Sequence, residues 1–315
     1  MKSQCCAGGG GNPVIGDVSG SVLSMGEMEA GVNYQYINSN KVLDFNKIDT
    51  VYKSKYQSNY LYVRLAYGLT KELTLSLETG YWVNKTQYGL GFSDTTSSHG
   101  FGDMVLNLRY NILNKKNWDL TAGLGMKFPL GAYNDSIKKI EPFLGEEFYL
   151  IKPPSTQLSS GSYDLIFNIL LSKSFPNVGI VLSSNTNYIL KTYNPLGEKM
   201  GDYLCETLTF RKTFWKKLSL AAHFKYEYIA KMKINPTVAM WSMLLYDPLA
   251  SGSHKLFITP QINYSPFKGF NIYCSADIPV YQYVNNKQIA SKVLLMAGII
   301  YRFQVYTPAC CEVKE

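Results

Sequence analysis

The chain has 315 residues, of which 46% are hydrophobic and 17% are charged, with 25 tyrosines and a net charge of +8. This composition excludes a disordered chain, because it supplies ample apolar surface for burial. No apolar run approaches the ~18 residues that a membrane-spanning helix requires. The basic residues form no Lys/Arg-rich cluster, so we expect no binding to nucleic acid.

The first element in chain order is a Gly-rich segment, residues 1–23, that contains no apolar stretch typical of a signal peptide. We expect a mature chain from which the signal peptide has been removed. Residues 1–23 are predicted to form a periplasmic segment or a plug, residues 24–304 a single barrel, and residues 305–315 a periplasmic tail.

Two pairs of adjacent cysteines lie in these terminal segments: Cys5 with Cys6, and Cys310 with Cys311. If both ends lie in an oxidising periplasm, disulfides between the tails are the favoured outcome. A four-thiolate metal site is the alternative, but adjacent cysteines fit its tetrahedral geometry poorly. No metal site is therefore predicted, and acylation of Cys5 or Cys6 is left open.

Residues 24–304 show apolar side chains at every second position, which is the period of β-strands with one apolar face. The pattern predicts twelve strands, at residues 27–36, 61–67, 73–83, 103–112, 118–127, 163–172, 178–188, 204–211, 218–228, 256–264, 270–280 and 292–303. Short connections, such as residues 114–117 and 265–269, alternate with long ones, such as residues 84–102 and 131–161. An even number of strands with this alternation indicates an all-β, closed, up-and-down antiparallel transmembrane β-barrel with both termini on the periplasmic side.

The charges of the predicted strands favour a membrane barrel over a soluble one. Twelve apolar faces supply far more side chains than a small lumen holds, so the apolar face is expected to meet lipid and the polar face to line the lumen. The predicted lumen residues are Glu29, Arg64, Glu78, Asp103, Arg109, Lys127, Asp164, Arg211, His223, Lys225, Glu227, Asp277 and Arg302. These charges indicate either a polar conduit or an ion-pair network that fills the barrel.

Three charged residues fall on the apolar face instead: Lys173, Glu206 and Lys212. The two lysines lie near short turns, where long side chains reach the membrane interface. Glu206 is an exception, for which a register slip or a bulge is the expected explanation.

Aromatic side chains end many of the apolar stripes, for example Tyr36, Trp118, Tyr228 and Phe303. This distribution is typical of the aromatic girdles of outer-membrane barrels. It predicts a location in the bacterial outer membrane, in contact with the lipid bilayer and lipopolysaccharide.

Three segments resemble a known family. Gly100-Phe101-Gly102-Asp103 precedes an alternating strand, residues 122–131 read AGLGMKFPLG, and residues 161–165 read GSYDL. They resemble elements of the outer-membrane transporter family labelled for the meta-pathway of phenol degradation, over about residues 60–190. The resemblance implies a barrel of about twelve strands through which small, often hydrophobic, compounds pass. The doubled cysteines and the tail after the last strand depart from that pattern.

An enzymatic role requires a nucleophile with a base, or a metal. His99 and His254 lie at loop borders, and His223 is predicted to face the lumen within a strand. No complete serine, histidine and acid set accompanies them, so we predict no enzyme and no cofactor.

Two long loops carry apolar runs that either fold inward as a gate or face outward as a docking surface. Residues 141–151 include Phe143, Leu144, Phe148, Tyr149 and Leu150. The second loop, residues 234–250, has its apolar run at Met240, Trp241, Met243, Leu244 and Leu245.

The hypothesis favoured by the sequence is a passive outer-membrane channel for small solutes, hydrophobic ones among them. The alternative is a non-transporting barrel that serves as an accessory subunit of a complex with other outer-membrane proteins.

Overall fold

A computed structural model describes residues 22–51, 53–90, 93–140, 145–215, 217–235 and 247–306 of the chain. Several predicted features therefore lie outside the described residues: Cys5, Cys6, Cys310, Cys311, Phe143, Leu144, Met240, Trp241, Met243, Leu244 and Leu245. Cys205 and Cys274 lie in described strands as free thiols, the first buried and the second exposed.

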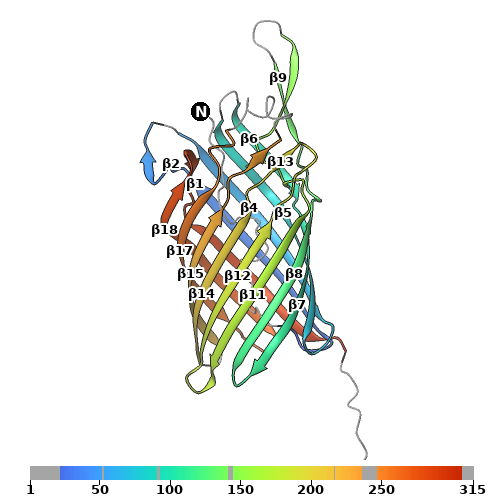
Figure 1. The fold of residues 1–315 in the computed structure, drawn as a ribbon. Coiled ribbons are helices and arrows are strands. Elements are labelled where there is room, and N and C mark those ends of the chain that lie inside the picture. The colour runs from blue at the N-terminus through green and yellow to red at the C-terminus, as the bar shows by residue number, and fades with distance from the viewer. Residues whose placement is uncertain are drawn as a thin grey trace, which may run out of the picture.

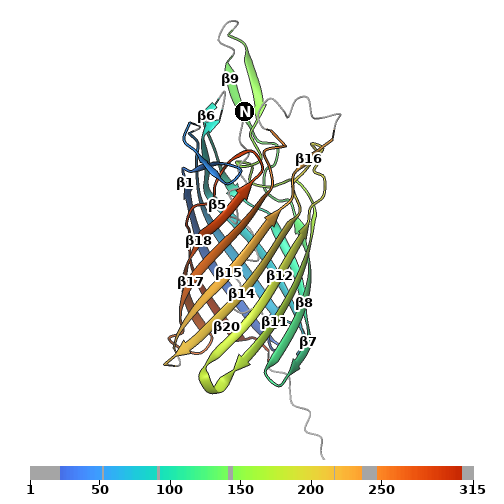
Figure 2. The same cartoon turned by 60° about the vertical axis from the view of Figure 1, so that its left-hand side comes forward.

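Twelve antiparallel strands form a closed barrel, which confirms the predicted fold class (Figures 1 and 2). In chain order these strands are β1 (Glu27–Ser39), β4 (Lys55–Gly68), β5 (Leu73–Leu90), β7 (Met104–Lys115), β8 (Trp118–Phe128), β11 (Asp164–Phe175), β12 (Ile180–Leu190), β14 (Tyr203–Phe214), β15 (Leu218–Ile229), β17 (Ser253–Tyr264), β18 (Phe270–Val284) and β20 (Leu294–Gln304). The barrel closes where β1 pairs with β20, for example at Val32 opposite Ile299. Each of the other strands pairs with its neighbour in this order.

The connections differ between the two ends of the barrel, as the sequence predicts. At one end, the short-turn end, Lys116 and Asn117 join β7 to β8 with positive φ angles of 51° and 67°. This conformation matches the twist of a two-residue hairpin. The single-turn 3₁₀ segment Pro176–Val178 joins β11 to β12 there. The described chain ends also lie at this end, since the Val305 N–H donates to the Gly26 carbonyl oxygen.

The other end, the long-loop end, carries further short strands (Figure 1). They are β2 (Val42–Asp44), β3 (Lys47–Asp49), β6 (Ser93–Phe101), β9 (Ser136–Ile140), β10 (Glu147–Ile151), β13 (Glu198–Lys199), β16 (Lys233–Ile234) and β19 (Lys287–Ile289). Residues 84–102 form the long connection that the sequence predicts, but most of it is strand. There β5 continues to Leu90 and pairs with β6, so this connection is an extension of the barrel wall.

Side chains alternate between the two faces of every barrel strand. On β20, Leu295 and Ile299 point outward with about half of their surface exposed, 50% and 47%, whereas Met296 between them is 3% exposed. The same parity holds around the barrel, so the outer surface is apolar on all sides. Burying this surface requires an apolar surrounding, because a water-soluble monomer rarely exposes contiguous apolar patches of this extent.

Glu206 lies on the outer face, and the expected register slip is wrong. The pairings of Glu206 with Thr186 on β12 and Tyr226 on β15 continue without a shift along β14. The carboxylate is therefore placed among outward apolar neighbours by an ordinary strand. No helix in the described part of the chain is long and apolar enough to cross a membrane.

Candidate functional site in the barrel lumen

The inward charges gather into three networks, the first of which lies toward the short-turn end. Arg302 Nε lies 2.6 Å from one Glu29 carboxylate oxygen, and Arg64 Nη1 lies 2.9 Å from the other. Arg64 Nε also lies 3.2 Å from Glu78, which accepts a hydrogen bond from the Tyr62 hydroxyl. Adjacent strands supply these side chains: Arg302 lies directly opposite Glu29, Arg64 lies directly opposite Glu78, and Arg64 is one inward position along β4 from Ala66, the partner of Glu29. Two arginines and two glutamates leave this network, the lower ladder, without net charge.

The second network lies midway along β15, β17 and β18. Lys225 forms an ion pair with Asp277, whose other oxygen accepts a 2.7 Å hydrogen bond from Thr259. The Lys225 ammonium also lies 4.4 Å from the ring centre of Phe257, in the geometry of a cation–π contact. Both charged side chains are at least 95% buried, and isolated charges cannot be held there without partners.

Glu227 extends this second network toward the long-loop end. Its carboxylate lies 3.6 Å from Lys255 Nζ and accepts a 3.1 Å hydrogen bond from the Tyr203 hydroxyl. Lys255 is absent from the predicted lumen set because the sequence pattern places the start of its strand at residue 256, three residues too late. The structure begins β17 at Ser253, which puts Lys255 on the inward face.

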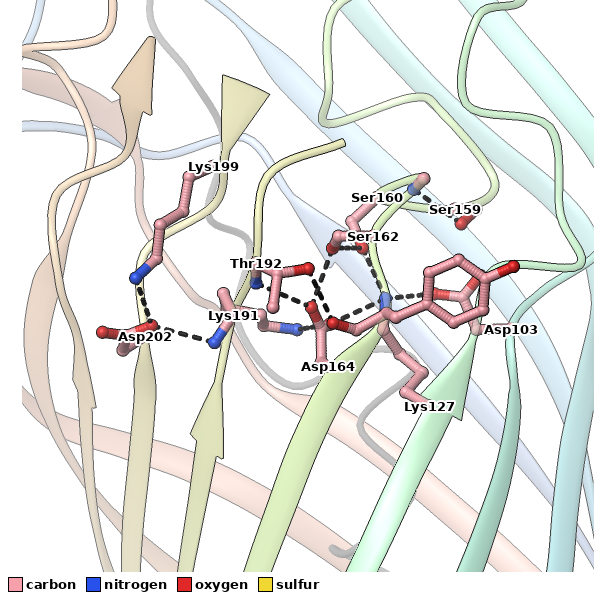
Figure 3. A network of polar contacts seen from close by, with 12 residues as sticks. Asp103, Lys127, Ser159, Ser160, Ser162, Asp164, Lys191, Thr192, Lys199 and Asp202 are labelled. Carbon is pink, nitrogen blue, oxygen red and sulfur yellow. Dashed lines mark hydrogen bonds and ion pairs between the residues drawn. The ribbon is translucent and has the colours of Figure 1, made fainter. Parts of the chain in front are cut away.

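The third network lies at the rim of the long-loop end (Figure 3). Lys127 Nζ lies 2.7 Å from Asp103 and 2.9 Å from Asp164. Lys191, the first residue after β12, also lies 2.9 Å from Asp164. Burial and the nearby Lys127 ammonium lower the pKa of Lys191. Asp164 has no exposed surface and is the acid that both ammonium groups share.

A polar segment of the β10–β11 connection folds onto this rim network. Residues 152–162, here called the inner strap, bring Ser160 to Lys127 and place the Ser162 hydroxyl 2.8 Å from Asp164 (Figure 3). The Asn194 side-chain amide donates to the Ser160 carbonyl oxygen at 3.0 Å. The inner strap is therefore bonded to β8, to β11 and to the loop after β12.

The opposite side of the inner strap is held by the β5–β6 hairpin. Lys85 Nζ donates to the Gln157 carbonyl oxygen at 2.5 Å, and Lys152 Nζ donates to the Ser97 carbonyl oxygen at 2.8 Å. The Ser155 hydroxyl donates to Gln87. Thr156, midway along the strap, is fully buried.

An aromatic cluster on the inner wall completes the contacts of the inner strap. The rings of Tyr60 and Trp82 lie 4.2 Å apart between centroids, and Leu158 of the strap packs against them. Gly80 makes room for this arrangement, because a Cβ there would lie 2.2 Å from the Tyr60 ring. One part of the lumen wall is thus apolar and aromatic, beside the charged rim.

Three other predicted lumen residues face inward as well. His223 on β15 lies 2.8 Å from the Thr209 hydroxyl and 3.1 Å from Gln261, so both ring nitrogens have partners. Arg109 on β7 is 3% exposed, and Arg211 takes an inward position on β14. Among the described residues, no group of three or more His, Cys, Asp or Glu side chains is arranged to hold a metal ion.

The inner strap and the aromatic cluster are the parts of the site that sequence reasoning misses. The strap, KPPSTQLSSGS, has neither an apolar run nor a strand period. The sequence instead favours the apolar run just before the strap as a gate or docking surface. In the structure, β10 places Phe148 and Tyr149 of that run in a hairpin that projects away from the barrel, where they are 40% and 67% exposed. The signal for the cluster was present in the inward parity of Tyr60, Tyr62 and Trp82.

Comparison with solved structures identifies proteins of the same architecture. The chain is similar to the COG4313 outer membrane channel from Pseudomonas putida F1, with a TM-score of 0.64 and 14% identity over 91% of this chain and 98% of the other. The β domain of the Bordetella autotransporter BrkA gives a TM-score of 0.52 and 10% identity over 88% and 100%. The barrel has the fold of an outer-membrane channel. No known family profile and no curated protein matches the sequence.

Proposed function

We propose that the protein is a passive channel of the bacterial outer membrane for small solutes. The observation that carries this proposal is the opposite chemistry of the two barrel faces. The outer face is apolar on all sides, while the inner face holds the three ion-pair networks. A lipid-facing exterior and a polar interior are the properties of channel-forming barrels. The short-turn end would face the periplasm, as it does in such barrels.

An apolar part of the lumen wall supports the proposal that hydrophobic compounds are among the solutes. The Tyr60 and Trp82 rings, each 4% exposed beneath Leu158, would offer an apolar surface beside the charged rim when the inner strap moves aside. A solute with an apolar body gains by contact with such a surface and avoids desolvating the neighbouring charges. The phenol-pathway label of the resembling family is not proposed as a substrate.

Solute uptake into liposomes tests the proposal. Liposomes that contain the full chain should swell faster in small solutes than liposomes containing heat-denatured protein. When Trp82→Ala removes the aromatic surface, the uptake of apolar alcohols about the size of toluene should fall more than the uptake of glycerol. Uptake equal to the denatured control for every solute would contradict a channel, and equal loss for both solute classes would contradict only the hydrophobic preference.

The two terminal segments are proposed to be separate from the barrel, with boundaries at residues 24 and 304. Leu23 itself is held by the barrel, since it is 3% exposed and its N–H donates to the inward Thr74 hydroxyl at 2.8 Å, so the separate N-terminal segment would end just before it. Removal of residues 1–22 is expected to raise solute uptake if the segment acts as a plug and to leave it unchanged if the segment lies in the periplasm.

A second candidate function is favoured by the hairpin of β9 and β10. It projects beyond the barrel and exposes Ile140, Phe148 and Tyr149. A two-stranded hairpin is marginally stable alone, so an accessory barrel that docks another outer-membrane protein through it is the alternative. Gentle extraction should then yield a partner at equal stoichiometry, which is lost when residues 137–150 are replaced by a short turn. A solitary barrel in both cases would exclude this role.

A further inference from the structure

The outer face of the barrel carries one feature that an apolar, lipid-facing surface does not explain. Glu206 is the single acid with outward parity in the described barrel strands, between the outward Leu204 and Leu208 of β14. Its two carboxylate oxygens accept hydrogen bonds from the hydroxyls of Ser184, at 2.6 Å, and Thr186. The side chain is partly exposed. A carboxylate held in this way has lone pairs left for a donor outside the protein.

Aromatic side chains continue from Glu206 toward the long-loop end. Tyr226 lies opposite Glu206 in the β14–β15 register, and its hydroxyl is 2.9 Å from His254 Nδ1. The His254 ring lies 4.8 Å from Tyr228 and 6.4 Å from Tyr283. Tyr283 in turn lies 5.8 Å from Phe45. These six residues, Glu206, Tyr226, Tyr228, His254, Tyr283 and Phe45, are called the outer strip.

The outer strip ends beneath a hairpin that overhangs the barrel wall. Phe45 lies in the turn between β2 and β3, and this hairpin leans away from the barrel axis (Figure 1). The hairpin is fixed by the pairing of β2 with β19 and by the 2.6 Å ion pair of Lys287 with Asp49. Its outer part exposes Ile48 and Val51, which are 61% and 87% accessible.

Three exposed lysines belong to the same region: Lys47 lies in the hairpin at the start of β3, and Lys41 and Lys53 flank it. The overhang thus combines apolar side chains that can enter a membrane interface with ammonium groups that attract phosphate. Because the outer strip is continuous with the apolar belt of the barrel, a lipid that touches the belt also reaches the strip with its headgroup. The order from the belt outward is carboxylate, aromatic rings and imidazole, then lysines.

This order selects among lipid headgroups. A carboxylate repels the phosphate of an ordinary phospholipid, but it accepts hydrogen bonds from sugar hydroxyl or amide groups. Flat aromatic faces pack against the C–H faces of a sugar ring, and lysines beyond them bind phosphate groups carried by the sugar. A headgroup that presents hydroxyl or amide donors, a ring and phosphate in this order satisfies all three parts.

We propose that the outer strip and the β2–β3 overhang bind the headgroup of a phosphorylated glycolipid in the leaflet at the long-loop end. This inference rests on the proposed membrane location, and it assigns a specific lipid class to one face of the barrel.

Native mass spectrometry of the full chain in mild detergent tests the proposal. The probes are a bis-phosphorylated, acylated glucosamine disaccharide, phosphatidylglycerol, and inorganic phosphate in excess. We expect the glycolipid to bind at least about tenfold more tightly than phosphatidylglycerol, since one charge-assisted hydrogen bond supplies that factor. Inorganic phosphate should not compete, because it lacks the sugar and the acyl chains.

Two variants locate the site. Glu206→Gln should weaken glycolipid binding about tenfold and leave phosphatidylglycerol unchanged, and Glu206→Asp should restore part of the affinity. Lys47→Gln with Lys53→Gln should weaken both lipids. The matched control is Lys138→Gln with Glu147→Gln, an ion pair on the separate β9–β10 hairpin, which should bind as the unmodified chain does.

Three results would overturn the inference. One is equal glycolipid affinity in all variants, and another is equal affinity of the unmodified chain for the two lipids. The third is a dimer that Glu206→Gln dissociates, which would make the strip a contact between two copies of the chain. Loss of lipid selectivity with solute uptake retained refutes this inference alone, whereas failure to insert into liposomes refutes the proposed function. Thermal unfolding of each variant shows that it remains folded.

Discussion

The short-turn half of the lumen and its long-loop rim are built in different ways. In the lower ladder, Arg302, Glu29, Arg64 and Glu78 come from four consecutive strands of the barrel, so strand register alone brings them together. At the rim, Lys127 and Asp164 also pair through register, but Lys191 and the inner strap arrive from loops. The strands therefore fix the charge pairs along the barrel, whereas loop segments determine how its mouth is occupied.

The largest effect on stability is expected when the lower ladder loses Glu29, the acid that two arginines share. Glu29→Ala leaves Arg302 and Arg64 facing each other, and Glu29 is only 2% exposed. We expect a loss of about 3 kcal/mol in the free energy of unfolding, the low end of the range for breaking a buried pair, because both arginines retain some access to water. Denaturant unfolding in detergent measures it. Glu27→Ala, at the half-buried start of the same strand, is the matched control; it removes one hydrogen bond from the Ser24 N–H and should cost about 1 kcal/mol.

The rim should respond in function more than in stability. Asp164→Asn leaves two lysines with Asp103 alone, which weakens the hold on the inner strap by about 2 kcal/mol and shifts its detachment about 30-fold. We expect a higher single-channel conductance with little change in global unfolding. Asp119→Asn, which lies at the other end of β8 and bonds to Asn111, should leave the conductance unchanged. Equal conductance of both variants would show that the strap does not obstruct the mouth.

A smaller effect is expected from the apolar anchor of the inner strap. Leu158→Ala removes packing against Tyr60 and Trp82, at a cost of about 1–2 kcal/mol because the side chain is only partly buried. Hydrogen exchange of the Leu158 and Ser159 amides, both bonded to the Ala132 carbonyl oxygen, should become faster. If these amides keep their protection, the polar anchors alone hold the strap.

The smallest effect concerns Glu198 in the loop between β12 and β14. Burial raises the pKa of this carboxyl, and its hydrogen bond from Asn194 only partly opposes that shift. Its contribution to local stability is therefore complete below the unfolded pKa near 4.5 and is lost as the pH rises through the higher folded pKa. Glu198→Gln should remove this pH dependence and slow amide exchange at Gly197 at neutral pH. An unchanged pH profile would contradict the assignment.

Strand period makes most of the barrel predictable from the sequence. The twelve strands, their inward parity and the alternation of turns with loops all arise from a two-residue repeat that the barrel preserves. Lys255 is missed because the apolar alternation is recognisable only from Leu256, three residues after β17 begins at Ser253. The inner strap could not be predicted, since its position depends on contacts with Lys85 of β5, Ser97 of β6 and Lys127 of β8, three strands that are distant from it in sequence. Glu206 was identified correctly as an exception, but only the unbroken register shows that it faces outward.

Single-channel recording of the full chain in planar bilayers tests the central claim most directly. A passive channel with a strap at its mouth predicts discrete conductance steps that grow when Asp164→Asn loosens the strap. Protein that inserts into the bilayer, keeps its barrel and gives no steps, with or without that substitution, would contradict it.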